Sequence, residues 1–372
     1  MTTLDTPIRL ERPRTVLFGT GTLAQLGDWL SAHDYHRPFI VADPFLHDRL
    51  DTLHLANLRH YTDVRGEPDI PMLNAAVAAA DGCDVVIGYG GGSAMDLAKL
   101  VAVMQNGHPA LADISGPNRA PQRTVGLIQI PTTAGTGSEA GTRALITNPE
   151  NLSKIATESP HMLADLAIID PQTMLSVPPA VTAATGVDAM AHCVEAYTSK
   201  RAHPLIDDYA LRGIELVGKY LQRAVDNGMD EEARSGMALA SFYGGICLGP
   251  VNTTAGHAVS YPLGPRYKIP HGLANALIFP HTLAVNRDAC AEKTAKIGAA
   301  LGFAAHDRAS AFAGAYAFCK RLGLAMRLRD HGVEESALPA MAEEAHAIRR
   351  LLDWNPVDLP ADDILALYRA AY

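Results

Sequence analysis

The sequence contains little cysteine, no excess of basic charge and no long hydrophobic run. Its 372 residues include five cysteines without a CxxC pair, which excludes a zinc ribbon and argues against a disulfide framework. A formal net charge of −9 argues against nucleic acid or an anionic membrane as the main partner. No run approaches the roughly 18 apolar residues of a membrane span, and the N-terminus has no signal-peptide core. These absences predict a cytoplasmic protein.

The chain is long enough for two domains, and the pattern of its first half predicts an α/β domain. Runs rich in Val and Ile alternate there with stretches of helical periodicity, which favours a parallel sheet covered on both faces. Strands are expected within 15–21, 38–46, 75–104, 124–140 and 163–171.

The pattern changes at SVPPAVT, residues 176–182, where two prolines end the alternation. From Ala183 onward, long apolar-periodic stretches dominate and strand signals are rare. We therefore predict an α/β domain over 1–180 and an all-helical domain over 181–372.

Two loops of small residues follow predicted strands. In DVVIGYGGGSAMDLAK, residues Gly90, Gly91, Gly92 and Ser93 stand where a helix begins. Glycines let the backbone approach a ligand closely, and a helix N-terminus favours phosphate, although any tight strand-to-helix turn also uses glycine. The second loop, PTTAGTGSE at 131–139, strengthens the nucleotide interpretation, because open α/β sheets bind nucleotides at the carboxyl ends of their strands.

Asp43 closes a third predicted strand. Its carboxylate suits a ribose diol and would repel a 2′-phosphate, which predicts a preference for NAD(H). The alternative is a turn-forming aspartate before Pro44.

One carboxylate and three imidazoles in the second half form a candidate metal site. Asp188 and His192 are four residues apart in a predicted helix and project from one face of it. His257 and His271 lie further along the chain, so the fold has to bring them to the first pair. Such a set suits a divalent metal, Fe(II) or Zn(II), whereas the first pair alone could be a helical surface pair.

Several of these segments together make the chain similar to the iron-containing (group III) alcohol dehydrogenases. The matching segments, in order, are GGGSAMDLAK, PTTAGTGSE, LSKIAT, AIIDP, the Asp188–His192 pair and H…PHGLANALIFPH. The resemblance implies a Rossmann-like N-terminal domain, a helical C-terminal domain and a metal in the cleft between them, the architecture also found in dehydroquinate synthases. It further implies a homodimer or larger homo-oligomer.

The resemblance also assigns roles to residues. It implies that Asp188, His192, His257 and His271 bind the metal. His281 also matches a recurrent family histidine, but nothing in its spacing makes it a ligand, and we expect a buried histidine that is either part of the core or hydrogen-bonded to a ligand. Contacts to the dinucleotide are implied for Gly91, Gly92, Ser93, Thr132, Thr133 and Leu145, with Asp96 near the pyrophosphate turn and Lys154 near the nicotinamide. Asp43 matches the acidic position that accompanies NAD preference in this family.

Tyr261 departs from the family pattern, because many members carry a second histidine four residues after the third ligand. A tyrosine hydroxyl can pass a proton, but it titrates near pH 10. The HAVSYP pattern around it also resembles the hydroxyacid–oxoacid transhydrogenases of the same superfamily.

Three functions are therefore considered. The first is a metal-dependent, NAD(H)-linked alcohol dehydrogenase or aldehyde reductase acting on a small molecule. The second is a transhydrogenase that keeps its nicotinamide bound. The third is a metal-dependent lyase on the same fold, or an NAD-sensing protein without turnover.

Arg143 lies on the strand that leaves the Thr/Gly loop. By the resemblance it faces the nicotinamide end of the cleft, and its planar guanidinium suits a substrate carboxylate, phosphonate or sulfonate. The alternative is a pairing with a nearby acid or with a cofactor phosphate.

Overall fold

The computed structural model describes residues 3–150 and 153–372, which form two compact units. The α/β unit comprises residues 10–133 and 137–176. The helical unit comprises residues 134–136, 177–372 and the N-terminal residues up to Arg9. Leu152, which opens the matched LSKIAT motif, lies outside the described residues, as do the first two residues of the N-terminus.

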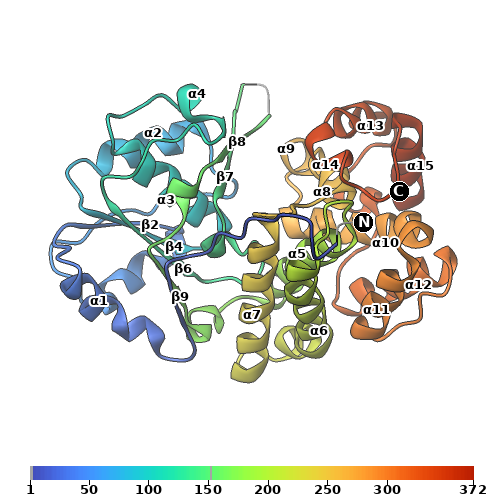
Figure 1. The fold of residues 1–372 in the computed structure, drawn as a ribbon, viewed down its shortest axis with the longest axis horizontal. Coiled ribbons are helices and arrows are strands. Elements are labelled where there is room, and N and C mark those ends of the chain that lie inside the picture. Colours follow the sequence, from blue (N-terminus) through green and yellow to red (C-terminus); the bar gives the residue numbers. More distant parts are fainter. Residues whose placement is uncertain (1–2, 151–152) are drawn as a thin grey trace. The chain divides into compact units, whose positions relative to one another are not determined.

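A six-stranded sheet in the order β1-β9-β6-β4-β2-β3 forms the centre of the α/β unit (Figure 1). All of its strand pairs are parallel, which confirms the predicted parallel sheet. Its strands are β1 (Thr15–Phe18), β2 (Pro38–Ala42), β3 (Arg59–Tyr61), β4 (Val85–Gly90), β6 (Gly126–Pro131) and β9 (Leu166–Ile169).

Strand β2 illustrates why the sheet is covered on both faces. Phe39 and Val41 belong to one buried apolar cluster, whereas Ile40 and Ala42 belong to another. Successive side chains of a strand point to opposite faces, so every residue of β2 is buried.

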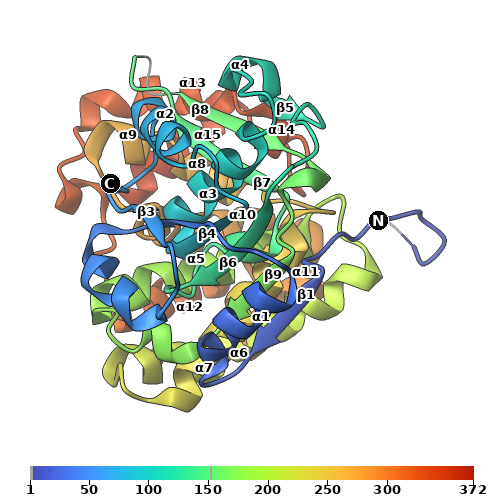
Figure 2. The ribbon, with the colours of Figure 1, turned by 90° about the vertical axis from the view of Figure 1, so that its left-hand side faces the viewer.

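Figure 2 shows the same unit from its side. Its helices are α1 (Leu26–Ala32), α2 (Ile70–Ala79), α3 (Gly92–Met104) and α4 (Leu111–Ile114), with 3-10 helices η1 (Thr22–Gln25), η2 (Pro44–Leu53), η3 (Ser138–Ala140), η4 (Pro160–Met162) and η5 (Pro171–Met174).

A smaller sheet joins β5 (Gly116–Pro117), β8 (Lys154–Glu158) and β7 (Arg143–Thr147). Strands β7 and β8 are antiparallel, and Arg143 stands opposite Glu158 in their register. This hairpin carries three residues that the sequence assigns to the site: Arg143, Leu145 and Lys154.

The helical unit begins with α5, in which 16 of 20 residues are buried. An all-round buried helix packs against neighbours on every side, which explains its small residues. Gly186 is one of them, because a side chain there would collide with Leu221 of α6. The α-helices are α5 (Pro179–Thr198), α6 (Pro204–Asp226), α7 (Glu231–Leu248), α8 (Ala255–Ser260), α9 (Leu263–Tyr267), α10 (His271–Asn286), α11 (Ala291–Leu301), α12 (Arg308–Arg321), α13 (Leu338–His346), α14 (Arg349–Leu352) and α15 (Ala361–Ala371). The 3-10 helices are η6 (Arg287–Cys290), η7 (Leu328–His331) and η8 (Glu335–Ala337).

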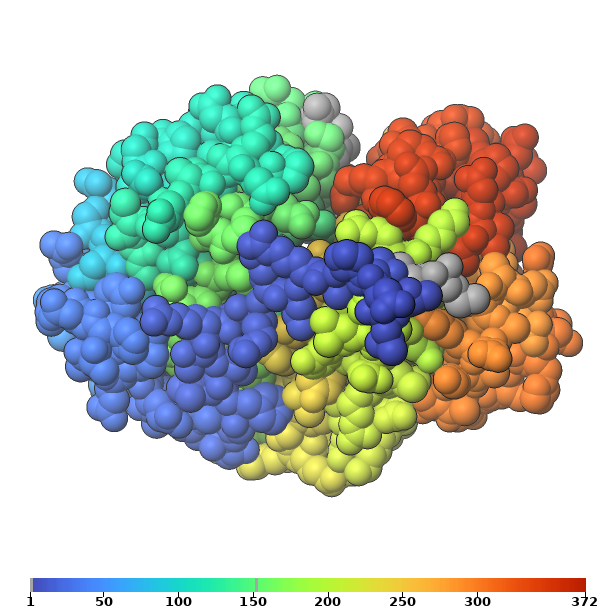
Figure 3. All heavy atoms as spheres, viewed as in Figure 1, coloured from blue at the N-terminus to red at the C-terminus, as the bar shows by residue number. Residues whose placement is uncertain are grey.

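The N-terminal segment belongs to the helical unit, although the sequence prediction places it with the α/β domain. In Figure 3 it crosses the surface of this unit as a dark blue strip. His203, which caps α6, anchors it, since the Nε2 atom of His203 lies 3.0 Å from the carbonyl oxygen of Thr6.

Candidate functional site

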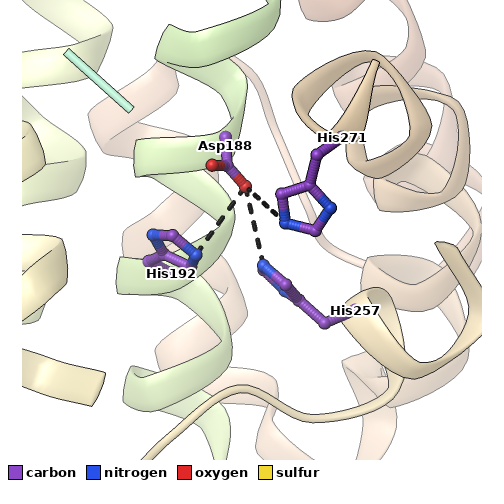
Figure 4. Close-up of side chains that lie close together, drawn as sticks. All are labelled: Asp188, His192, His257 and His271. Carbon is purple, nitrogen blue, oxygen red and sulfur yellow. Dashed lines mark ion pairs between the residues drawn. The ribbon is translucent and has the colours of Figure 1, made fainter. Parts of the chain in front are cut away.

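Three helices of the helical unit bring four side chains together in its interior. Asp188 and His192 lie one turn apart on α5, His257 lies on α8, and His271 is the first residue of α10 (Figure 4). One donor atom from each side chain lies within 4.8 Å of the others. The structure thus brings together the two pairs that the sequence leaves far apart.

The spacing of these atoms fits a coordinated metal better than direct hydrogen bonding. The Nε2 atom of His192 lies 3.7 Å from Asp188 Oδ1, and the Nε2 atoms of His257 and His271 each lie 3.5 Å from it. Four donors at a bond length of about 2.0–2.2 Å define a tetrahedron whose edges are roughly 3.4 Å. The carboxylate and imidazoles also match the ligands that iron and zinc accept.

The charges of the cluster also favour a cation. Burial opposes ionisation of Asp188, but the three histidines outweigh it and hold the pKa of this carboxyl well below its ordinary value. Burial lowers the pKa of His192 to about 4 despite the attraction of Asp188. Burial would lower the pKa of His257 as well, but Glu195 and Asp188 outweigh it and raise that pKa to about 10. The negative potential that raises it also attracts a divalent metal.

Glu195, which the sequence analysis misses, holds His257 in place by a hydrogen bond. The Nδ1 atom of His257 donates to Glu195 Oε1 at 2.6 Å, and the backbone N–H of Thr254 donates to Oε2 at 2.6 Å. A carboxylate on the far nitrogen of a ligating histidine keeps the near nitrogen free for metal. Gly256 makes room for it, since a Cβ atom there would lie 2.6 Å from Glu195 Oε1. The signal available in the sequence is spacing, because Glu195 is seven residues after Asp188 on the same helix face.

Asn275 is the second residue that the sequence analysis misses. Its Nδ2 atom donates to Asp188 Oδ1 at 2.7 Å and lies 3.1 Å from His257 Nε2 and 3.3 Å from His271 Nε2. The hydroxyl of Ser260 donates to its Oδ1 atom at 2.6 Å, which orients the amide. Asn275 is 2% exposed and follows His271 by one helical turn, so it fixes the Asp188 carboxylate from α10.

Tyr261 lies beside the cluster. Its ring centroid is 6.2 Å from that of His257, edge to face, and 5.9 Å from that of His271. His281 is apart from the four donors. It packs against Phe312 at 4.9 Å, and burial lowers its pKa to about 4.

In the α/β unit, the glycine turn lies at the carboxyl end of β4. Strand β4 ends at Gly90 and α3 begins at Gly92. The backbone N–H of Gly91 donates to Asp43 Oδ2 at 2.9 Å, and burial raises the pKa of Asp43 against that hydrogen bond. Gly90 cannot carry a side chain, because a Cβ atom would collide with the Asp43 carboxylate and lie 2.8 Å from the Cβ atom of Ala94.

The Thr/Gly loop adjoins this turn. The Thr132 backbone N–H donates to the Gly90 carbonyl at 2.9 Å, and Thr133 Oγ1 lies 3.5 Å from the position of a Cβ atom on Gly91. The hydroxyl of Thr132 is buried and has no hydrogen-bond partner in the described part of the chain. Ser93 follows in the first turn of α3. The structure thus gathers the predicted glycines, both threonines, Ser93 and Asp43 at one edge of the sheet.

Asp96 is engaged within the protein. It accepts from the Ser138 hydroxyl at 2.5 Å and from the backbone N–H of Leu145 at 2.8 Å. The buried ammonium of Lys99 donates to the same hydroxyl at 2.8 Å. Asp96 therefore ties α3 to η3 and β7, and Leu145 meets it through its backbone.

The two cations of the hairpin have carboxylate partners. The guanidinium of Arg143 donates to Glu158 Oε2 from Nη2 at 2.7 Å and from Nε at 3.2 Å. Lys154 pairs with Glu67 and donates to the Thr147 hydroxyl at 3.1 Å. Pairing with a nearby acid is the alternative that the sequence analysis considers for Arg143, and its substrate role stays a prediction.

Comparison with known families identifies the chain. Residues 13–171 match the iron-containing alcohol dehydrogenase model, and residues 182–372 match the C-terminal model of the Fe-containing alcohol dehydrogenase family. The chain belongs to the iron-containing alcohol dehydrogenase family. Its predicted class, an oxidoreductase acting on CH–OH groups, is confirmed.

Individual relatives agree with this assignment. The chain is 40% identical over 323 residues to long-chain-alcohol dehydrogenase 1 of Geobacillus thermodenitrificans, covering 84% of this chain and 81% of that one. A 1,3-propanediol oxidoreductase structure superposes with a TM-score of 0.91 at 30% identity, covering 99% and 100%. The sulfoacetaldehyde reductase of Bifidobacterium kashiwanohense, solved with NAD+, gives 0.89 at 30% identity, covering 98% and 99%.

These relatives bear on the predicted function and cofactors. The prediction of a metal-dependent, NAD(H)-linked alcohol dehydrogenase or aldehyde reductase is confirmed at the level of the family. The predicted cofactors, iron and NAD(H), are confirmed at the same level, because the family is named for iron and one solved neighbour holds NAD+. No helix in the described ranges is both long and apolar enough to cross a bilayer.

Proposed function

We propose that this member of the family reduces a small aldehyde with NADH, or oxidises the corresponding alcohol, at a metal held by Asp188, His192, His257 and His271. The convergence of these four donors in the helical unit is the observation that carries the proposal. When bound, the metal would polarise the substrate oxygen and the nicotinamide would carry the hydride.

The surrounding residues hold the four donors in place. Glu195 accepts the Nδ1 proton of His257 and so leaves Nε2 for the metal. Asn275 donates to one oxygen of Asp188 and limits its rotation. Both contacts restrict the orientation of donor side chains, as a preorganised metal site requires.

The α/β unit would bind the dinucleotide mainly through its backbone. Gly90, Gly91 and Gly92 bring the chain close to the pyrophosphate, and Ser93 and the threonine hydroxyls add donors. The buried hydroxyl of Thr132 has no hydrogen-bond partner among residues 3–150 and 153–372, which supports this role, since buried polar groups are normally hydrogen-bonded. Asp43 would accept from the ribose diol, which favours NAD(H) over NADP(H).

Tyr261 is our candidate for the proton donor at the substrate oxygen. Its position against the rings of His257 and His271 supports this role. Lys154, if it serves the nicotinamide, would do so while paired with Glu67, and Leu145 would contact the cofactor by its side chain.

The substrate is proposed to be a small aldehyde or alcohol, with or without an acid group. An acid group is supported by the sulfoacetaldehyde reductase among the solved neighbours, since sulfoacetaldehyde carries a sulfonate. Arg143 could hold that group only in competition with Glu158.

We also propose a cytoplasmic homo-oligomer. All five cysteines are free thiols, which suits a reducing compartment. Light scattering of the purified protein measures its mass, and a monomer at all concentrations contradicts the oligomer.

The function is tested by metal-free protein reloaded with Fe(II) or Zn(II) and screened for oxidation of NADH with small aldehydes. We expect steady consumption of free NADH, and a lower kcat/KM with NADPH. A transhydrogenase would instead turn over only with a hydroxyacid and an oxoacid together. A lyase or a binding protein would consume no NADH at all.

A further inference from the structure

Of the four donor side chains, that of His271 is the one exposed to solvent. The side chain of His271 is 32% exposed, whereas those of Asp188, His192 and His257 are 3%, 5% and 2% exposed. Of the four donors, His271 is therefore the one that solvent reaches. A substrate bound at the four donors would therefore meet the residues that lie next to His271.

Tyr261 lies next to His271. Its ring is half-buried, and its centroid is 5.9 Å from that of the His271 ring. The guanidinium of Arg350, from the short helix α14, lies over the Tyr261 ring, with its central carbon 5.7 Å from the ring centroid. Distances below about 6 Å define a cation–π contact. The Tyr261 ring thus lies close both to His271 and to the Arg350 guanidinium.

Arg350 is exposed, and no carboxylate in residues 3–150 or 153–372 forms an ion pair with it. The adjacent Arg349 differs in this respect, since it pairs with Asp353 and lies 3.7 Å from Asp358. A cation–π contact uses the charge of a guanidinium and leaves its N–H donors available. Arg350 therefore offers a planar set of donors that fits a carboxylate or a sulfonate.

We propose that Arg350, held over Tyr261, determines a preference for aldehydes that carry an acid group at the end remote from the carbonyl. The inference rests on the proposed function, because it assumes that the aldehyde oxygen is bound at the four-donor cluster. It assigns recognition of the acid group to Arg350 rather than to Arg143, whose guanidinium already contacts Glu158.

The test compares succinate semialdehyde with butanal, which has the same chain length and lacks the carboxylate. The ratio of their kcat/KM values is measured with NADH for the wild type, Arg350→Ala, Arg143→Ala and the matched control Arg349→Ala. We expect a wild-type ratio well above one, a ratio lower by on the order of tenfold in Arg350→Ala, mainly through KM, and an unchanged ratio in Arg349→Ala. Added salt should lower the wild-type ratio and have less effect on that of Arg350→Ala.

The outcomes separate this inference from the function beneath it. If the wild type reduces neither aldehyde, the proposed function fails. If it reduces both but prefers butanal, or if Arg350→Ala keeps the wild-type ratio, the assignment of Arg350 is wrong. If the ratio falls in Arg143→Ala alone, Arg143 rather than Arg350 binds the acid group, and the inference is likewise overturned.

Discussion

The two candidate sites differ in whether side chains or backbone atoms form them. In the helical unit, the cluster consists of side chains that are mostly buried, and the buried residues Glu195 and Asn275 hydrogen-bond to two of them. In the α/β unit, the glycine turn consists largely of backbone, and the residue type matters most where a side chain would intrude, as at Gly90. A metal needs lone pairs at fixed positions, whereas a pyrophosphate needs exposed N–H groups and room. Metal binding should therefore be lost when a side chain is removed, and dinucleotide binding when a side chain is added. Each substitution should leave the other site unaffected.

The largest effect is expected from removing a donor. His257→Ala or Asp188→Ala should lower metal affinity and turnover by more than about 10²-fold, since changes in supporting residues alone cost about 10–100-fold. NADH binding should remain, because the glycine turn belongs to the other unit. Metal analysis and NADH fluorescence titration check both parts. His281→Leu, a buried histidine outside the cluster, is the control, and full metal content in His257→Ala contradicts the assignment.

A smaller loss is expected from Glu195→Gln, which keeps the volume of the side chain and removes its charge. His257 should then be less firmly held in the tautomer that presents Nε2, and metal affinity should fall by about 10–100-fold. Competition with a chromogenic chelator measures this affinity without reference to turnover. Glu344→Gln, at the exposed partner of Arg266, is the matched control. Equal affinities in the two variants would show that Glu195 does not tune the site.

The glycine turn should respond to an added group rather than to a removed one. Gly90→Ala places a methyl group against the Asp43 carboxylate, and overpacking of this kind costs roughly 1–3 kcal/mol. We expect NADH affinity to fall by on the order of tenfold while metal affinity stays unchanged. Gly27→Ala, where a Cβ atom meets open space, should alter neither. Calorimetric titration with NADH and with metal distinguishes these results.

The smallest effect on either site is expected at His281, whose titration should change stability instead. Burial lowers its pKa to about 4, below the ordinary value of 6.5. The neutral ring therefore contributes stability that is present above pH 6.5 and is lost as the pH falls toward 4. His281→Leu should reduce the loss between pH 7 and pH 4 by on the order of 2–3 kcal/mol, and the exposed His306→Leu should not. Thermal melts at both pH values decide this, and parallel curves for all three proteins would refute it.

Local patterns were enough to predict the parallel sheet and the helical second half, and to single out the glycine turn and the Asp188–His192 pair as candidates for the two sites. Alternating strands and helices depend on short-range periodicity, and glycine turns depend on neighbouring residues, so both are visible in one dimension. The Asp188–His192 pair is visible for the same reason, because one helical turn aligns the two side chains.

Only the tertiary structure decided which partners surround these residues. Glu195 and Asn275 carry no motif of their own, and their roles follow from the packing of α5, α8 and α10 around one point. Arg143 and Arg350 show the same dependence, since strand register places the first opposite a carboxylate and helix packing places the second over a tyrosine ring. Long-range contacts of this kind depend on how the elements pack, and packing is a property of the whole chain rather than of any local segment.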